Sequence, residues 1–454
     1  MTRFRVAASR RLDGATPRST LLRLLLALSL LAMLGAPPAR AQQPAPGSEA
    51  SGEARRVFEH ARERLVQVRT LALPSRAQAS TGSGFVVAED GLVVTNYHVV
   101  SQAAAERGPY ALEWVGVDAS SGPLEIVAID VRHDLALLRR KSGAPLPYLA
   151  LAPETRELQR GERVFSLGKP LDLGFVVSEG LYNGVVERDL YGHLLFSGAL
   201  NAGMSGGPAL DADGRVIGIN VARRLDGQLV SFLIPVRYLH ELLAAPAQNL
   251  AELPQRLAEI NRQLRLHQAA MVERVLAAPW PTQIQGPYRV PVLPDGLARC
   301  WGGNDADNEN GLSTTSTQCN LSAGRFVSGN LILGTVRLDH RHVESTRLTD
   351  WAFWTAMRGQ FANRVFGLRK DRQRTPPRCE EADVETAIGA QRVVFCLGGY
   401  HRFEGLFQMT LLTMTLTHPK ASLSSHLYAD GITEANARRL AQTFLESMRW
   451  NRAP

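Results

Sequence analysis

Long apolar runs are scarce in this sequence, and the run near its start is too short to cross a membrane. Residues 24–34 are apolar but fall short of the ~20 residues that a spanning helix needs. An arginine-bearing stretch precedes this run, and Ala39-Arg40-Ala41 follows it with small residues where a signal peptidase cuts. Residues 1–41 are therefore predicted to be a signal peptide cleaved before Gln42, which directs the protein to the periplasm or outside the cell. An uncleaved membrane anchor is the alternative.

Positive charge is scarce outside that segment. The formal net charge is +8, but residues 1–41 hold seven arginines against the single acid Asp13, which leaves +2 for the rest of the chain. Binding to nucleic acid requires a clustered positive surface on the folded part, so no nucleic-acid partner is expected. Hydrophobic residues make up 45% and charged residues 21%, which is ordinary for a globular protein.

Cysteine is scarce too. The four cysteines all lie at position 300 or later, and they are Cys300, Cys319, Cys379 and Cys396. No two are spaced as Cys-x-x-Cys, so a zinc site is not expected and no metal is predicted. An even number in an exported chain indicates two disulfides. Three pairings are possible, and the sequence-local one, Cys300–Cys319 with Cys379–Cys396, is favoured.

With 454 residues, the chain is longer than one hydrophobic core usually organises, so two folded units are expected. Residues 42–60 read as a flexible leader with a short helix, and residues 61–240 as the first unit. Within it, short β runs are punctuated by glycines and there is hardly any helical spacing, which predicts a barrel or sandwich. The predicted strands include 65–69, 83–87, 92–96, 124–129, 135–139, 163–167 and 216–221.

Helical spacing begins after Pro235. Apolar residues from Leu253 to Val275 recur at steps of three, four or seven, so residues 241–285 are predicted to be a helical connector, closed by two prolines. Residues 286–454 form the second unit, predicted as a separate α+β domain. It has β-like runs at 326–338, 393–397 and 407–416, and it ends in an amphipathic helix around 437–448.

Three short segments carry the chemistry. They are Thr95-Asn96-Tyr97-His98, His133-Asp134-Leu135 and Asn201-Ala202-Gly203-Met204-Ser205-Gly206-Gly207. A serine attacks a carbonyl only if a base takes its proton, an imidazole can be that base, and a carboxylate holds the imidazole in one tautomer. His98, Asp134 and Ser205 are therefore predicted as a catalytic triad.

The segment around Ser205 also offers backbone N–H groups that can stabilise negative charge. The tetrahedral intermediate of acyl transfer places negative charge on the former carbonyl oxygen, which requires preorganised donors. Because glycine permits the tight turn that aligns neighbouring amides, the backbone N–H groups of Gly203 and Ser205 are predicted to form an oxyanion hole. A Gly-x-Ser-Gly-Gly run alone would also suit a plain flexible loop, and His98 or Asp134 alone would suit structural roles.

Taken together, these segments resemble the chymotrypsin-fold serine peptidases, and within them the HtrA/DegP branch. Residues 82–87 with 95–98 are similar to that branch's histidine segment, and residues 130–136 to its aspartate segment. Further similarity lies at 161–164, 168–170, 180 and 214–220, so the resemblance covers about residues 60–240. It implies two six-stranded β-barrels with the triad between them, so the expected fold class is mostly β: two barrels, a helical connector and the α+β domain.

The resemblance also locates a substrate pocket and one departure. Position 199, six residues before Ser205, lies at the base of the first specificity pocket in this fold; here it is Ala199, followed by Leu200, and Asn220 lies on the strand beside the pocket. No carboxylate is present, so cleavage after small or medium apolar residues is expected, although these residues would equally fill a barrel core. Met204 stands where the branch usually has asparagine, which leaves open how the oxyanion pocket is set.

The sequence thus predicts an exported serine endopeptidase that needs no cofactor and acts on proteins or peptides, with a homo-oligomer possible. An alternative from another class is a binding or chaperone-like protein that keeps the peptidase fold with little turnover. An esterase using the same triad is a further alternative. The C-terminal unit does not resemble the PDZ domains that usually follow this catalytic domain.

Overall fold

The computed structural model describes residues 51–451, except 141–144, 224–228, 306–310 and 367–371. The predicted signal peptide, residues 1–41, lies outside the described residues. The first element is helix α2 (Gly52–Ala61), which begins after Ser51, whose hydroxyl accepts the Ala54 N–H at 3.1 Å as an N-cap. A short 3-10 turn (Arg62–Arg64) joins it to the first strand.

Two closed six-stranded antiparallel barrels follow, as the fold prediction required. The first barrel contains β1 (Leu65–Ala72), β2 (Ala77–Val86), β3 (Leu92–Thr95), β4 (Tyr110–Gly116), β5 (Ser121–Asp130) and β6 (Leu135–Arg140), with helix α3 (Tyr97–Ala105) after β3. The second contains β7 (Arg163–Gly168), β8 (Val176–Val185), β9 (Leu194–Phe196), β10 (Pro208–Leu210), β11 (Val216–Arg223) and β12 (Ser231–Pro235). Valine, leucine and isoleucine fill their buried positions, which suits strands packed on an enclosed core.

The two barrels share one hydrophobic cluster. Phe85 and Val94 from the first barrel pack with Phe165, Leu167 and Ile219 from the second, and all five are fully buried. Removing such side chains from water is the main force that holds the barrels together. The segments carrying the predicted catalytic residues therefore meet across a shared core.

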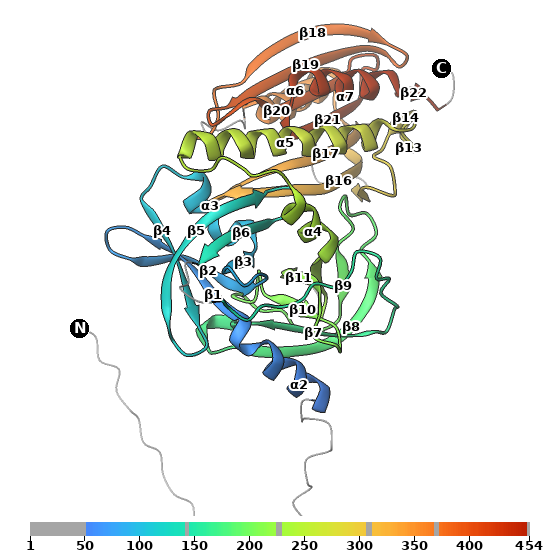
Figure 1. The fold of residues 1–454 in the computed structure, drawn as a ribbon. Coiled ribbons are helices and arrows are strands. Elements are labelled where there is room, and N and C mark those ends of the chain that lie inside the picture. Colours follow the sequence, from blue (N-terminus) through green and yellow to red (C-terminus); the bar gives the residue numbers. More distant parts are fainter. Residues whose placement is uncertain (1–50, 141–144, 224–228, 306–310, 367–371, 452–454) are drawn as a thin grey trace, which may run out of the picture. The chain divides into compact units, whose positions relative to one another are not determined.

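Two helices follow the second barrel, α4 (Val236–Ala244) and α5 (Leu253–Leu276). Helix α5 is amphipathic, as its spacing predicted, but its apolar face contacts two regions. Ile260 and Leu264 pack in a cluster with first-barrel residues, whereas Met271 and Val275 pack in the core of the C-terminal sheet. Figure 1 shows α5 lying between the barrels and that sheet.

The C-terminal region is a seven-stranded antiparallel sheet in the order β15-β16-β17-β21-β20-β19-β18, with a small three-stranded sheet of order β13-β14-β22 beside it. Its strands are β13 (Thr282–Gln285), β14 (Tyr288–Pro291), β15 (Arg299–Asp305), β16 (Ser313–Ser328), β17 (Leu331–Glu344), β18 (Arg378–Thr386), β19 (Gly389–Tyr400), β20 (Phe403–Thr415), β21 (Ala421–Ile432) and β22 (Arg449–Trp450). Helices α6 (Asp350–Phe366) and α7 (Glu434–Glu446) complete it.

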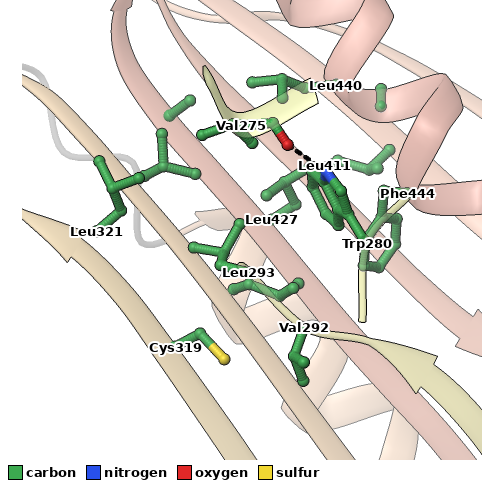
Figure 2. Packing of buried hydrophobic residues seen from close by; sticks show 14 of the residues in the cluster. Val275, Trp280, Val292, Leu293, Cys319, Leu321, Leu411, Leu427, Leu440 and Phe444 are labelled. Carbon is green, nitrogen blue, oxygen red and sulfur yellow. Dashed lines mark hydrogen bonds between the residues drawn. The ribbon is translucent and has the colours of Figure 1, made fainter. Parts of the chain in front are cut away.

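The core of this region lies between the sheet and helices α5 and α7. Figure 2 shows Leu440 and Phe444 of α7 packed with Leu411 and Leu427 of the sheet. The indole N–H of Trp280 donates to the Val275 carbonyl at 3.0 Å, so this large ring is buried with its polar atom satisfied.

Both disulfides pair as the sequence favoured. Cys300 bonds Cys319 across β15 and β16, and Cys379 bonds Cys396 across β18 and β19. In each case the two cysteines are direct partners in the strand register, which brings their Cα atoms to about 4 Å. The cysteines therefore tie together the two strands at each edge of the sheet.

One predicted strand is in fact a hairpin. Residues 326–338 were expected to form a single β run, but β16 ends at Ser328 and β17 begins at Leu331. The turn between them is Gly329-Asn330, and Gly329 has a φ of +55°, a conformation that glycine adopts at little cost. Apolar residues continue on both sides of this two-residue turn, and for that reason the sequence predicted one continuous strand.

Among the described residues, no helix is long and apolar enough to span a bilayer.

Candidate active site

His98 and Asp134 lie next to each other in the first barrel. His98 is the second residue of α3, and Asp134 lies in the turn between β5 and β6. The imidazole Nδ1 lies 2.7 Å from Asp134 Oδ2, while the backbone N–H of His98 donates to Oδ1 at 2.8 Å. One carboxylate therefore fixes both the ring and the start of the helix, and an anion at a helix N-terminus also interacts favourably with the helix dipole.

The backbone at Asp134 is shaped for this task. Asp134 has a φ of +56°, in the left-handed region that Asp and Asn tolerate better than other side-chain-bearing residues. Its carbonyl accepts hydrogen bonds from the Tyr97 N–H at 3.1 Å and from the Asn96 side-chain amide at 2.9 Å. Four hydrogen bonds to Asp134 thus join the turn to the start of the helix around His98.

The electrostatics of the pair favour a charged imidazole. Burial by itself lowers the pKa of His98, but the charge of Asp134 and its hydrogen bond outweigh burial, so the pKa lies above the usual 6.5. A base with a raised pKa accepts a proton more readily, which suits a general base that must become cationic during the reaction.

Ser205 lies in a loop of the second barrel, residues 201–207, called here the serine loop. Gly203 has a φ of +94°, and a Cβ built on it would come within 2.5 Å of the Lys169 carbonyl, so only glycine suits this position. The N–H groups of Gly203 and Ser205 donate to no acceptor within the described part of the chain. Both donors predicted for the oxyanion hole are therefore available.

The serine loop is tied to the first barrel through Ser83, which was not among the predicted site residues. Its N–H donates to the Ser205 carbonyl at 2.7 Å, and its hydroxyl donates to the Gly203 carbonyl at 2.7 Å. The same hydroxyl accepts the Lys169 N–H at 2.9 Å. Ser83 is buried on β2 within Gly82-Ser83-Gly84, so that short motif was the available signal.

Met204 anchors the other side of the loop. Its side chain is 1% exposed and packs in the core of the second barrel with Leu200. Its N–H donates to Asn201 O at 3.0 Å, and its carbonyl accepts the Gly207 N–H at 3.1 Å. The thioether therefore points into the barrel, where a methionine fills space without needing a polar partner.

The two segments approach each other closely. A Cβ built on Gly206, which follows Ser205, would come within 2.8 Å of the Asn96 N–H, two residues before His98. The hydroxyl of Ser205, however, donates to the Val221 carbonyl at 3.1 Å. Rotation of the Ser205 side chain about its Cα–Cβ bond is thus the movement that would present its hydroxyl to His98.

The residues predicted for the substrate pocket occupy three different environments. Ala199 is exposed, Leu200 is buried with the second-barrel core, and Asn220 is fully buried. The Asn220 amide donates to Leu167 O at 2.8 Å and to Met204 O at 3.2 Å, and its backbone carbonyl accepts the Gly206 N–H at 2.9 Å. Asn220 therefore holds the serine loop through hydrogen bonds to Met204 and Gly206.

A second histidine–aspartate pair, Asp130 and His133, lies directly before Asp134 in the sequence. His133 Nδ1 is 2.6 Å from Asp130 Oδ2, and the His133 ring stacks on Tyr238 with centroids 3.7 Å apart. Burial raises the pKa of Asp130, but its hydrogen bond and charge interaction with His133 outweigh this, so the pKa is lowered and the carboxyl is ionised. This pair is buried, whereas the His98 side chain is 29% exposed, so of these two histidines His98 is the one open to solvent.

The C-terminal region contacts the segments that carry His98 and Asp134, which the sequence did not reveal. The buried Tyr97 hydroxyl donates to Val327 O at 2.8 Å. Gln263 of α5 accepts the Val131 N–H at 2.6 Å and donates to Ile129 O at 2.8 Å. These bonds join residues more than 100 positions apart, so no local sequence pattern predicts them.

No group of three or more histidine, cysteine or acidic side chains arranged to bind a metal ion occurs in the described ranges.

Comparison with known proteins defines the class of this site. Residues 82–219 match the family described as trypsin-like peptidase domain. These residues are therefore similar to a trypsin-like peptidase domain, and the fold, with two six-stranded barrels, agrees with that similarity.

Several serine proteases, some of them named HTRA, are similar to part of the chain. It is 31% identical to serine protease HTRA1 of Xenopus laevis over 242 residues, which cover 50% of each chain. It is 35% identical to human serine protease HTRA4 over 176 residues, covering 36% of this chain and 34% of that one. It is 33% identical to the putative serine protease HhoB of Synechocystis over 188 residues, covering 39% and 41%. The chain thus spans half or less of the length of these relatives.

A solved structure, the serine endoprotease of Yersinia pestis, matches with a TM-score of 0.38 and 22% identity, covering 43% of this chain and 66% of that one.

Proposed function

We propose that the protein is an exported serine endopeptidase whose catalytic residues are His98, Asp134 and Ser205. The observation that carries the proposal is the junction of the two barrels: a carboxylate-bound imidazole on α3 lies beside a serine loop with two unused N–H donors. The family match and the serine proteases among the relatives support it.

The proposed reaction is acyl transfer. Ser205 Oγ attacks the carbonyl carbon of the scissile peptide bond while His98 Nε2 takes its proton, and the carbonyl oxygen becomes an oxyanion between the Gly203 and Ser205 N–H groups. The C–N bond then breaks, and His98 returns the proton to the departing amine. Water attacks the acyl-enzyme with His98 again as base, and this step releases the acid and restores Ser205.

Two finer features belong to the proposal. Cleavage after small or medium apolar residues fits Ala199 as a small, uncharged, exposed side chain at the predicted pocket. Export fits the two disulfides, because such bonds persist in oxidising compartments. The natural substrates are proposed to be proteins or peptides.

Digestion of a denatured protein mixture by purified mature protein tests this function. We expect cleavage with small or apolar residues before the cut, and no cleavage by Ser205→Ala. Ester turnover without peptide turnover would identify an esterase instead. If neither substrate class is cleaved while unfolded protein is bound, the chaperone-like alternative replaces the proposal.

A further inference from the structure

The tip of the β16–β17 hairpin lies against the helix that carries His98. Val327 is fully buried in a cluster with Val99 and Val100 of α3, and its carbonyl accepts the Tyr97 hydroxyl. At the far end of α3, Arg402 donates to the Ala105 carbonyl at 2.6 Å and to the Ser328 hydroxyl at 2.8 Å. Val327 and Ser328, adjacent residues at the end of β16, are thus attached to the two ends of the helix, Ser328 through Arg402.

Phe326, the residue before Val327, lies beside the imidazole. Neighbouring residues of a strand point to opposite faces, so while Val327 enters the core, Phe326 faces away from it. Its ring is edge-on to His98, with centroids 6.2 Å apart and planes at 80°. The pairing of β16 with β17 is irregular between Phe326 and Ser328, and such irregularities re-aim side chains.

Both rings are only partly covered. Phe326 is half-buried, and the His98 side chain is 29% exposed. A peptide bound for attack by Ser205 must bring its scissile bond within reach of His98, so residues flanking that bond would come near this ring pair.

We propose that Phe326 is a substrate-contacting residue that the C-terminal region contributes to the cleft of the peptidase domain. This inference rests on the proposed function of the same site. Phe326 offers an apolar wall beside His98, so it favours an apolar side chain at one position flanking the scissile bond. The C-terminal region thereby takes part in choosing which bond is cut.

The test compares cleavage of a peptide library, varied at each position flanking the scissile bond, by wild type and by Phe326→Ala. A lost apolar contact in a substrate pocket changes discrimination by about tenfold. We expect the ratio of kcat/KM for apolar over polar residues to fall by about tenfold at one position only, and Phe326→Leu to restore most of it. A fluorophosphonate adduct at Ser205 in each variant shows that the site is formed.

A matched control removes another large aromatic side chain from the same region. Trp351 on α6 is 80% exposed, and Trp351→Ala is expected to keep the wild-type profile. An unchanged profile in Phe326→Ala would overturn the inference. An equal loss for all peptides, with a shifted pH profile, would overturn it as well, because Phe326 would then only position His98. If wild type itself neither forms the adduct nor cleaves, the proposed function fails first.

Discussion

His98 and Asp134 are held by hydrogen bonds from several parts of the chain, whereas the serine loop is held by one residue of the first barrel, Ser83, and one of its own barrel, Asn220. The first pair is joined directly at 2.7 Å, and the segments around it are bonded to α5 and to the C-terminal sheet. The serine loop is tied through Ser83 and Asn220, and the Ser205 hydroxyl points to the Val221 carbonyl.

This difference separates a part of the site that is already hydrogen-bonded as the reaction requires, the His98–Asp134 pair, from a part that is not, the Ser205 hydroxyl. In the proposed mechanism the histidine–aspartate pair needs little reorganisation, because its hydrogen bond is already formed. In the proposed mechanism Ser205 would have to turn its hydroxyl from the Val221 carbonyl toward the imidazole, so substrate binding would act on the serine loop.

The largest expected effect breaks the preset pair. In Asp134→Asn the amide would donate to His98 Nδ1, which forces the wrong tautomer, so kcat should fall by about 10⁴-fold. Asp134 raises the pKa of His98, and the base works deprotonated, so the acidic limb of kcat/KM lies above pH 6.5 in wild type and should move to lower pH in the variant. Activity measured against pH checks both. Asp130→Asn makes the same chemical change at the neighbouring pair, and an equal loss there would show that the pairs were assigned the wrong way round.

A second prediction tests the hydrogen bonds that Gln263 of α5 makes to the end of β5 and the turn after it. Gln263→Leu leaves the Val131 N–H buried without a partner and removes one of the two side-chain hydrogen bonds that the Ile129 carbonyl accepts, the other coming from Gln248, at a cost of about 2 kcal/mol in the free energy of unfolding. Urea denaturation measures this. Asn261, two residues earlier on α5, bonds only the exposed Glu404 carbonyl, so Asn261→Ala is the control and should cost far less. Equal losses of stability in the two variants would mean that the Gln263 hydrogen bonds do not stabilise the fold more than a surface hydrogen bond does.

A third prediction concerns the serine loop. Ser83→Ala removes the hydroxyl that donates to the Gly203 carbonyl and accepts from Lys169, so the oxyanion donors should lose alignment. We expect kcat to fall about tenfold, roughly 1.4 kcal/mol, with little change in KM. Steady-state kinetics separates the two constants. Ser80→Ala on the same strand serves as control, and a KM effect without a kcat effect would place Ser83 in substrate binding instead.

The smallest expected effect lies at the hairpin. Tyr97→Phe leaves the Val327 carbonyl unpaired and should lower the free energy of unfolding by about 1 kcal/mol. Tyr110→Phe is a matched control, because the Tyr110 hydroxyl bonds only the Glu106 side chain near the surface. Thermal or urea unfolding of the two variants gives the comparison. If the two variants are equally stable, the Tyr97–Val327 hydrogen bond does not stabilise the attachment of the hairpin to α3.

The sequence predicts the barrels and the three candidate residues because each lies in a short segment whose chemistry is local. His98 follows a strand, Asp134 lies in a turn, and Ser205 lies between glycines. Both disulfides were favoured for a similar reason, since cysteines close in sequence lie on paired strands.

The contacts of the C-terminal region could not be predicted in this way. Phe326 and His98 are distant in sequence, and Gln263 looks like any polar residue on an amphipathic helix. Their roles arise from tertiary packing, which leaves no periodic signal. The hairpin at 326–338 read as one strand for the same reason, because its turn has only two residues.

One measurement tests the central claim most directly: mass-spectrometric mapping of the fluorophosphonate adduct on purified mature protein, with unfolded substrate present and absent. The account predicts a single adduct on Ser205, lost in Ser205→Ala and strongly slowed in His98→Ala. An adduct that persists in Ser205→Ala, or no adduct under either condition, would contradict it.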